Sequence, residues 1–469
     1  MNRTKIVCTI GPACSDIETL KSMMLAGMDV ARFNMSHGTH ESHKQLIDLV
    51  KQARFELGLP VAIMLDTKGP EIRIKQFKKG KIMLKKGQDF ALTTENVEGD
   101  ETIVSVTYNR LPSIVKKGTR ILLNDGLIEL VVTGKTNTVI YTEVDVGGEL
   151  SNNKSINIPS VELNMEYLSI NDKNDLAFGV QNGVDCYSIS FVNSAQDVQD
   201  VRNYLASLGE KDAFIISKIE SAKGVERMDE IIRASDGVMV ARGDMGVEIH
   251  FEKLPAIQKE MIKIANDLGK YSITATQMLE SMVTNVRPTR AEISDVANAI
   301  YDGTSAIMLS GETSAGKNPV LAVETMQKIA TEAENSINYS NPIANLHFAK
   351  DITSGIGYAG CALASSLNAQ AILVTTNTGA SAISISRFKP ECPIIALTPN
   401  YKVYFKLSML WGVYPILDKV YFNTDELLKS AREKAKQNKL VKSGDLVIQT
   451  AGVITGSTGS NMLVVSEIE

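Results

Sequence analysis

The chain has 469 residues, of which 44% are hydrophobic and 22% are charged, a composition ordinary for a globular protein of two to four domains. Its net charge of −5 argues against nucleic acid as the main partner. We expect no membrane-spanning helix, because no apolar run approaches roughly 18 residues. The N-terminus lacks the apolar core of a signal peptide, and the five cysteines fit no zinc or redox spacing. These features predict a cytoplasmic protein with reduced thiols.

The first 70 residues alternate short apolar strands with amphipathic helices. Strands are predicted at 5–11, 29–34 and 60–66, and helices at 16–26 and 40–57. This alternation is typical of parallel β-strands joined by helices.

The pattern changes between residues 71 and 159. Alternating β-branched residues and Lys-Gly turns predict strands, with a hairpin at Asn124-Asp125-Gly126 and no clear helix. We interpret this segment as a small β lid domain inserted into the first unit.

The strand–helix alternation resumes after residue 159. Further strands are predicted at 183–191, 213–220, 237–244, 271–277 and 306–311. Helices are predicted between and after them at 172–181, 195–208, 254–268, 290–301 and 319–337. Segments 1–70 and 160–340 thus give eight strands in a length close to the ~250 residues of a (β/α)8 TIM barrel. An open doubly wound sheet is the alternative, but eight regular units favour the barrel.

Residues 341–469 read as a smaller C-terminal α/β domain. Its predicted strands lie at 371–376, 393–398, 413–417, 445–450 and 462–466. The whole chain is therefore expected to be α/β with three domains.

Polar residues follow most of the barrel strands, where the carboxyl ends of strands gather catalytic groups. Glu220 and Asp244 end neighbouring strands, and two carboxylates with room for substrate oxygens are how proteins usually hold Mg²⁺. Lys218 lies two residues before Glu220 and so on the same face of a regular strand. Arg32 and Arg73 are fork-shaped donors suited to phosphate. The residues alone indicate Mg²⁺-dependent chemistry on a phosphorylated or carboxylated small molecule.

One phosphate-binding pattern is rejected. Residues 311–317 imitate a P-loop, but Asn318 stands where the metal-binding Ser or Thr of that motif is required.

Six motifs together resemble the pyruvate kinase family over essentially the whole chain. They are the segments 32–38 (RFNMSHG), 65–73 (LDTKGPEIR), 216–220 (ISKIE), 275–282 (ATQMLESM), 287–292 (RPTRAE) and 308–313 (MLSGET). The resemblance implies transfer of the phosphoryl group of phosphoenolpyruvate to ADP, giving ATP and pyruvate. The resemblance is to the members of the family that lack an extra C-terminal domain, because the chain ends at Glu469.

The resemblance also implies roles for individual residues. Glu220 and Asp244 match the Mg²⁺ (or Mn²⁺) ligands, and Lys218 matches the residue that stabilises the transferring group. The other implied roles are K⁺ binding by Asn34, Ser36, Asp66 and Thr67; phosphate binding by Arg32; substrate carboxylate binding by Gly243, Asp244 and Thr276; and nucleotide binding by Asn34, His37, Arg73 and Lys154.

The family pattern carries further expectations. Glu71 stands at the position where Glu goes with K⁺ dependence and Lys replaces the ion, although Glu71 is alternatively only a solvated first residue of the lid. A homotetramer is implied, and the loop Thr376–Ser381 matches a site for a phosphorylated effector. The departures, Met35, Met245 and Val286, touch no implied ligand.

Two other functions are weighed against this one. A related Mg²⁺-dependent phosphoenolpyruvate or pyruvate barrel lyase would need no nucleotide lid, so the inserted domain and Lys154 argue against it. A non-enzymatic scaffold would have no reason to keep Lys218, Glu220 and Asp244.

Overall fold

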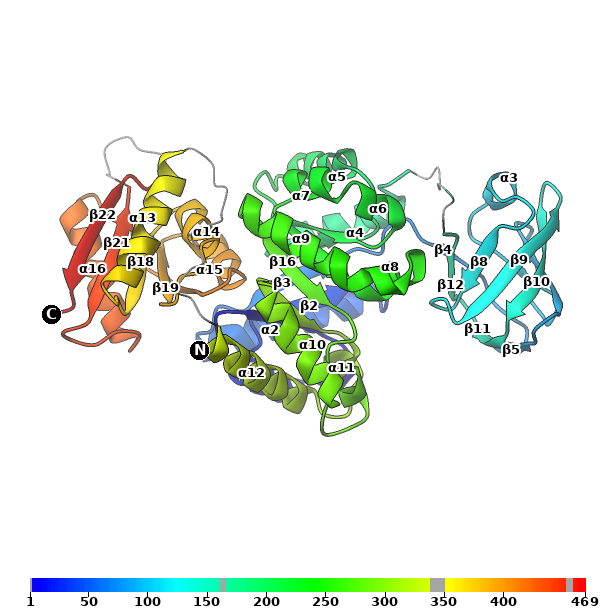
Figure 1. The fold of residues 1–469 in the computed structure, drawn as a ribbon, viewed down its shortest axis with the longest axis horizontal. Coiled ribbons are helices and arrows are strands. Elements are labelled where there is room, and N and C mark those ends of the chain that lie inside the picture. Colours follow the sequence, from blue (N-terminus) through cyan, green and yellow to red (C-terminus); the bar gives the residue numbers. More distant parts are fainter. Residues whose placement is uncertain (1, 160, 162–165, 338–350, 453–458) are drawn as a thin grey trace.

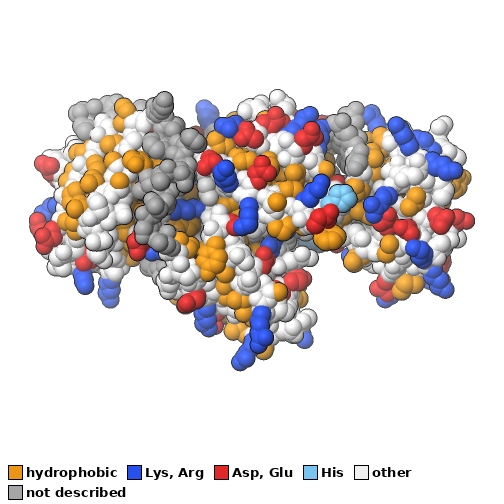
Figure 2. All heavy atoms as spheres, viewed as in Figure 1, with side chains coloured by type: hydrophobic (Ala, Val, Ile, Leu, Met, Phe, Trp, Pro, Cys, Tyr) orange, Lys and Arg blue, Asp and Glu red, His pale blue; other side chains and the backbone are white. Residues whose placement is uncertain are grey.

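The computed structural model describes the chain except residues 1, 160, 162–165, 338–350 and 453–458. Three sheet-containing bodies lie in a row, with the barrel in the middle, the inserted β-domain on one side and the C-terminal sheet on the other (Figure 1). None of the helices in the described part of the chain is long and apolar enough to cross a membrane. Basic and acidic side chains are interspersed over the face in Figure 2.

The central body is a closed parallel barrel of eight strands in the order β1-β17-β16-β15-β14-β13-β3-β2, which confirms the predicted barrel and excludes the open sheet. The strands are β1 (Lys5–Thr9), β2 (Val30–Asn34), β3 (Ala62–Asp66), β13 (Cys186–Ile189), β14 (Ile215–Ile219), β15 (Gly237–Ala241), β16 (Tyr271–Ala275) and β17 (Ala306–Leu309). Their side chains are almost all buried, inside the barrel or against the surrounding helices.

Helices cover the outside of the barrel (Figure 1). The main ones are α1 (Ile17–Ala26), α2 (His40–Leu57), α4 (Ile170–Gln181), α5 (Ala195–Ser207), α7 (Met228–Ala234), α9 (Leu254–Leu268), α10 (Arg290–Tyr301) and α12 (Pro319–Ser336), with the short α6 (Ala222–Glu226) and α11 (Gly311–Ser314). Local chemistry sets their ends: the Thr39 and Thr289 side chains cap α2 and α10 in capping boxes, and Gly58 ends α2 in the left-handed region.

One predicted barrel strand runs on into a helix. The segment predicted as strand 237–244 leaves the sheet after Ala241, and the short helix α8 (Arg242–Glu248) begins at once. Gly243 and Asp244 therefore lie in the first turn of a helix above the barrel, not on a strand. This placement brings them over the strand ends.

The inserted domain is antiparallel except for the parallel pair β6 and β7, and it has its own core. One sheet has the order β4-β12-β8-β9-β10-β6-β7, and β11 pairs with β5. The strands are β4 (Ile72–Arg73), β5 (Lys81–Leu84), β6 (Asp89–Thr93), β7 (Ile103–Ser105), β8 (Arg120–Leu123), β9 (Ile128–Lys135), β10 (Val139–Val146), β11 (Gly148–Ser151) and β12 (Ser155–Asn157). The predicted hairpin is confirmed, since Asn124 and Asp125 have φ of 53° and 56° between β8 and β9. A one-turn helix, α3 (Leu111–Ile114), corrects the expectation of no helix.

The C-terminal body is a five-stranded sheet in the order β20-β19-β18-β21-β22, parallel except for β22. Its strands are β18 (Ala371–Thr375), β19 (Ile394–Thr398), β20 (Val413–Leu417), β21 (Leu446–Ala451) and β22 (Met462–Glu467), with helices α13 (Ile352–Ser366), α14 (Ala380–Ser386), α15 (Tyr401–Ser408) and α16 (Thr424–Gln437). The predicted α/β fold is confirmed. The predicted domain boundaries at 159/160 and 340/341 involve residues outside the described part.

Candidate active site

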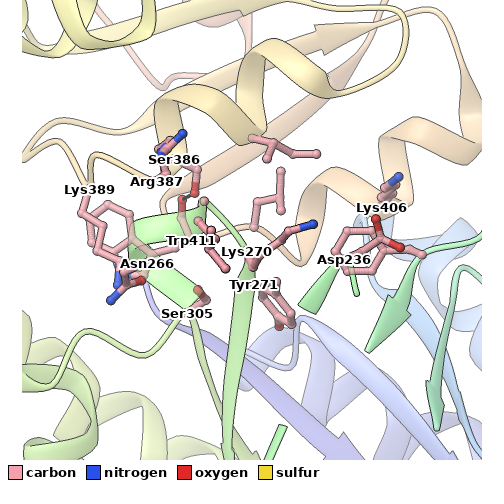
Figure 3. A pocket seen from close by; sticks show the side chains of 15 residues that line it. Asp236, Asn266, Lys270, Tyr271, Ser305, Ser386, Arg387, Lys389, Lys406 and Trp411 are labelled. Carbon is pink, nitrogen blue, oxygen red and sulfur yellow. Dashed lines mark hydrogen bonds between the residues drawn. The ribbon is translucent and has the colours of Figure 1, made fainter. Parts of the chain in front are cut away.

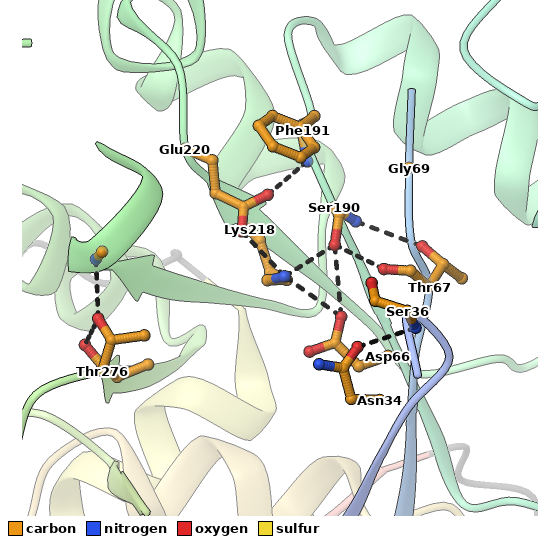
Figure 4. A network of polar contacts seen from close by, with 12 residues as sticks. Asn34, Ser36, Asp66, Thr67, Gly69, Ser190, Phe191, Lys218, Glu220 and Thr276 are labelled. Carbon is orange, nitrogen blue, oxygen red and sulfur yellow. Dashed lines mark hydrogen bonds and ion pairs between the residues drawn. The ribbon is translucent and has the colours of Figure 1, made fainter. Parts of the chain in front are cut away.

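The candidate site lies at the carboxyl ends of barrel strands β2, β3, β13, β14 and β16, beside α8 (Figure 4). Lys218, on β14, is its centre. Its ammonium donates to the Ser190 hydroxyl at 2.7 Å and pairs with Glu220 Oε1 at 2.9 Å and Asp66 Oδ1 at 3.3 Å. Burial acts to lower the pKa of Lys218, but the Asp66 and Glu220 carboxylates outweigh burial and raise it. Lys218 is therefore a fixed, protonated cation.

Arg32, on β2, holds the other oxygen of Asp66. Its Nε donates to Asp66 Oδ2 at 2.6 Å, and its Nη1 donates to the Thr9 hydroxyl at 2.8 Å. Burial acts to raise the pKa of Asp66, but Arg32 and Lys218 lower it below the usual value. One ionised carboxylate thus positions two cations at the mouth of the barrel.

Glu220 is fully buried and directly follows β14. Its Oε2 accepts the Phe191 backbone N–H at 2.7 Å. Burial raises the pKa of Glu220 to about 7; Lys218 opposes the shift, and the charge of Asp244 adds to it. A buried carboxylate that feels a second carboxylate is a suitable place for a divalent cation, which would neutralise both. The two acids fit the chemistry of Mg²⁺, and the described residues contain no cluster of three or more His, Cys, Asp or Glu that would suggest another metal.

Thr276 and Gly243 are brought together across the barrel mouth. The Gly243 N–H donates to the Thr276 hydroxyl at 2.8 Å, and Arg242 Nη2 donates to the Thr276 carbonyl at 2.6 Å. Thr276 and Gln277 have φ of 66° and 54°, a left-handed conformation that costs energy in non-glycine residues. Such strain is often stored at functional sites, and here it holds the Thr276 hydroxyl beside the first turn of α8.

The four residues matched to the K⁺ site also lie together (Figure 4). Asn34 Oδ1 accepts the Ser36 N–H at 3.1 Å, and the Thr67 carbonyl accepts the Ser190 hydroxyl at 2.6 Å. All four residues, including Asp66, offer oxygen ligands, which a hard alkali cation prefers.

The predicted site residues near the lid differ in how closely their side chains are connected to the rest of the site. Arg73, on β4, pairs with Glu71 at 2.9 Å and donates to the Asn153 carbonyl at 2.7 Å. Partial desolvation and the charges of Arg73 and Arg32 lower the pKa of His37, so His37 lies near both arginines. Lys154 accepts the Ile74 N–H through its carbonyl, but no hydrogen bond or ion pair joins its ammonium to another described residue. The described contacts therefore do not connect the Lys154 side chain to the site.

Sequence reasoning missed Ser190. Its hydroxyl accepts from Lys218, donates to the Thr67 carbonyl and lies 3.4 Å from Asp66 Oδ1. A serine carries no distinctive chemistry in a sequence, but Ser190 directly follows β13. Its position at the end of the fourth barrel strand is the signal that points to it.

An eight-stranded barrel whose mouth holds a fixed lysine and arginine around buried carboxylates defines an enzyme acting on small anionic molecules. Comparison with known proteins identifies the family. The family description "Pyruvate kinase, barrel domain" matches residues 1–323, and "Pyruvate kinase, alpha/beta domain" matches residues 354–466. The chain belongs to the pyruvate kinase family, and the lyase alternative has no support from these matches.

Similar proteins named pyruvate kinase come from several bacteria. The one from Sporosarcina psychrophila is 46% identical over 467 residues, which cover 99% of this chain and 80% of that protein. The one from Clostridium acetobutylicum is 45% identical over 473 residues, covering 100% of both. The one from Geobacillus stearothermophilus is 46% identical over 465 residues, covering 98% of this chain and 79% of its own.

Proposed function

We propose that the site around Lys218 transfers the phosphoryl group of phosphoenolpyruvate to ADP, giving ATP and pyruvate. The observation that carries the proposal is the Lys218 ammonium, which is held by Asp66, Glu220 and Ser190 at the barrel mouth. Phosphoryl transfer needs positioning and charge neutralisation more than covalent chemistry. A protonated, immobile lysine supplies both.

The substrate phosphate would lie against Arg32 and Lys218. Asp66 orients both cations and is itself kept ionised by them. Because these groups are already fixed, little reorganisation is needed as charge moves from the leaving enolate to the transferred group. Glu220 and Asp244 would hold Mg²⁺, or Mn²⁺, which when bound supplies further positive charge to the phosphate and enolate oxygens.

The substrate carboxylate would lie at the first turn of α8. The Gly243 N–H and the Thr276 hydroxyl lie in contact beside this turn, and N–H groups in a first helical turn favour an anion. A water held by the Thr276 hydroxyl would help to deliver a proton to the enolate carbon.

The nucleotide would bind between the barrel and the lid. His37 and Asn34 come from the barrel side of this space, and Arg73 and Lys154 come from the lid. Since the Lys154 ammonium has no partner among the described residues, we propose that the phosphates of ADP provide one. K⁺ would be held by Asn34, Ser36, Asp66 and Thr67.

We also propose the domain division 1–70 with 160–340, 71–159 and 341–469, a homotetramer, and a cytoplasmic location. The five cysteines are free thiols, four of them buried, as a reducing compartment would leave them. The loop Thr376–Ser381 is the proposed site of a phosphorylated effector. Thr376 and Thr378 already accept N–H groups of Gly379 and Ala380, so we expect weak binding. Alanine at Thr378 and Ser381 together should abolish any activation by sugar phosphates, and activation that survives would place the effector elsewhere.

The test is a turnover assay with phosphoenolpyruvate and ADP, run with Mg²⁺ and with K⁺ present or absent. Lys218→Met keeps the bulk and removes the charge, and losing one preorganised donor should lower kcat by about 10²–10³-fold. The variant should still exchange the methyl protons of pyruvate with solvent, because enolisation depends on the metal more than on Lys218. An unchanged kcat would remove Lys218 from the mechanism.

A further inference from the structure

A second cavity lies on the opposite side of the barrel from the active site. It occupies about 180 Å³ between the N-terminal ends of β14–β17 and the C-terminal domain (Figure 3). Lys270 and Asp236 come from the barrel, and Arg387 and Lys406 come from α14's end and α15. Phosphoryl transfer at the barrel mouth uses none of these residues.

Four cations line this cavity. They are Lys270, Arg387, Lys389 and Lys406. Each is partly buried, and burial lowers the pKa of all four. Holding these charges in the cavity therefore lowers the stability of the folded protein. Their concentration in one small space is unusual for side chains that prefer full exposure.

The lining holds fewer negative than positive side chains. Asp236 is the one carboxylate among its described residues, and it already pairs with Arg202 at 2.9 Å and accepts the Ile215 N–H at 3.0 Å. Within the described residues, no carboxylate forms an ion pair with Lys270, Lys389 or Lys406.

Three of the four cations donate to backbone carbonyls. Lys270 donates to the Ser235 carbonyl at 2.6 Å, Arg387 Nη2 donates to the Asp267 carbonyl at 2.9 Å, and Lys389 donates to the Gly303 carbonyl. These carbonyls lie at helix ends, so the contacts help hold the C-terminal domain to the barrel. An ammonium has three donors, however, and a carbonyl dipole does not neutralise a full charge.

We propose that this cavity binds a small phosphate-bearing anion. A phosphate offers several strong acceptors to lysine and arginine donors. Ligand pockets for larger molecules are usually ~300 Å³ or more, so about 180 Å³ suits inorganic phosphate or a short phosphate monoester better than a nucleotide.

The position of the cavity links it to the rest of the C-terminal domain. Ser386, in its lining, ends α14, and the loop Thr376–Ser381 leads into the start of the same helix. The cavity and that loop are therefore distinct places joined by one short helix. An anion at the cavity would also contact both the barrel and the C-terminal domain.

Trp411 provides a direct probe, because it is the only tryptophan in the sequence and lines the cavity. Its ring centroid is 5.9 Å from the Lys389 ammonium, so a bound anion should change its emission. The full-length protein would be titrated with inorganic phosphate and, separately, with glycerol phosphate, at constant ionic strength set by chloride. We expect a saturable change with one or both probes and none with chloride; their relative affinities identify free phosphate or a monoester as the better ligand.

Variants assign the signal to the cavity. Lys270→Met and Lys406→Met should each weaken phosphate binding about tenfold, the value of one charge-assisted hydrogen bond. Lys389→Arg keeps the charge and should retain binding if Lys389→Met loses it. Lys402→Met, on the same helix as Lys406 but paired with Glu210, is the matched control and should bind as the wild type does.

Two further variants separate this cavity from the other phosphate sites. Binding should persist in Lys218→Met, which alters the active site, and in the double alanine variant of Thr378 and Ser381. Loss of the signal in either, an unchanged affinity in all three cavity lysine variants, or the absence of a saturable change in the wild type would overturn the proposal.

Discussion

At the scale of single residues, the active site is a chain of opposite charges at the ends of β2, β3 and β14. Arg32, Asp66, Lys218 and Glu220 alternate in sign, and each is held by the next. Removing one partner of such a buried set leaves another charge uncompensated, so the effects of substitution should be large and not additive. Ser190 is the neutral member that fixes Lys218 within this set.

Ser190→Ala should lower kcat by about tenfold, because it removes one hydrogen bond to a charged group. The loss should be smaller than in Lys218→Met and should leave the KM for phosphoenolpyruvate nearly unchanged. Ser188→Ala is the matched control, since Ser188 lies on β13, two residues before Ser190, with a buried hydroxyl that has no hydrogen-bond partner among the described residues. Equal kcat values for the two variants would show that Ser190 does not position Lys218.

Glu71 tests the proposed K⁺ site. Its side chain is only 12% exposed and pairs with Arg73, which excludes the alternative of a solvated first residue of the lid. Wild-type turnover should fall strongly in K⁺-free buffer balanced with a bulky organic cation, and Na⁺ should substitute poorly. Glu71→Lys should recover part of the K⁺-free activity by placing an ammonium near the phosphates, whereas Glu71→Gln should not. Full wild-type activity without any alkali ion would refute the K⁺ assignment.

At the scale of elements, the sequence predicted all eight barrel strands because buried parallel strands are short apolar runs separated by capped helices. It could not predict where β15 ends. Ala241 and the residues after it carry no strong strand or helix signal, and the turn into α8 is fixed by tertiary contacts, in which Arg242 bonds to the Ala275 and Thr276 carbonyls. Because tertiary contacts are not visible in the sequence, the strand ends indicate candidate site residues but not the side chains to which these residues bond.

Helix α2 shows another limit of sequence reading. His37, His40 and His43 stand at every third residue, and this spacing does not reveal that His43 is buried, with its ring nitrogen 2.6 Å from the His37 carbonyl. His40 is more exposed and pairs with Asp175. Spacing alone cannot tell which side of a helix a neighbouring loop will cover.

A side-chain hydrogen bond joins the lid to α8. Asn157 Nδ2, on β12, donates to Glu248 Oε1 at 2.9 Å, and α8 also carries Gly243 and Asp244. Asn157→Ala or Glu248→Ala should raise the KM for ADP about threefold to tenfold, because the lid would lose a contact that holds it over the site.

The double variant should be no worse than either single variant if both remove the same contact. Breaking the Lys81–Glu149 pair, which lies within the lid, is the control and should change no kinetic constant. Additive losses in the double variant would show that the two residues act separately.

At the scale of the whole molecule, cationic side chains join the C-terminal domain to the side of the barrel where the strands begin. Lys5 donates to the Val413 carbonyl at 2.9 Å, Arg54 lies over the Phe405 ring at 3.5 Å, and Lys389 reaches the Gly303 carbonyl. The sequence predicted both bodies but could not predict this interface, because partly buried lysines and arginines look like surface residues in a sequence. The interface should therefore respond to pH.

Lys389 gives that response a sign. Burial lowers its pKa to about 7, whereas a lysine in the unfolded chain titrates near ~10.4. Between these values the unfolded chain binds a proton that the native protein does not, so the Lys389 contribution to the free energy of unfolding increases with pH. Below about pH 7 Lys389 is protonated in both states, and the cost of burying its charge is fully present. Lys389→Met removes this cost, so the variant should gain thermal stability relative to the wild type most at pH 6.5 and progressively less toward pH 10. Thermal unfolding of both proteins across this range, with Lys402→Met as the exposed control, measures the difference. A difference that does not change with pH would show that Lys389 is not a buried titrating group.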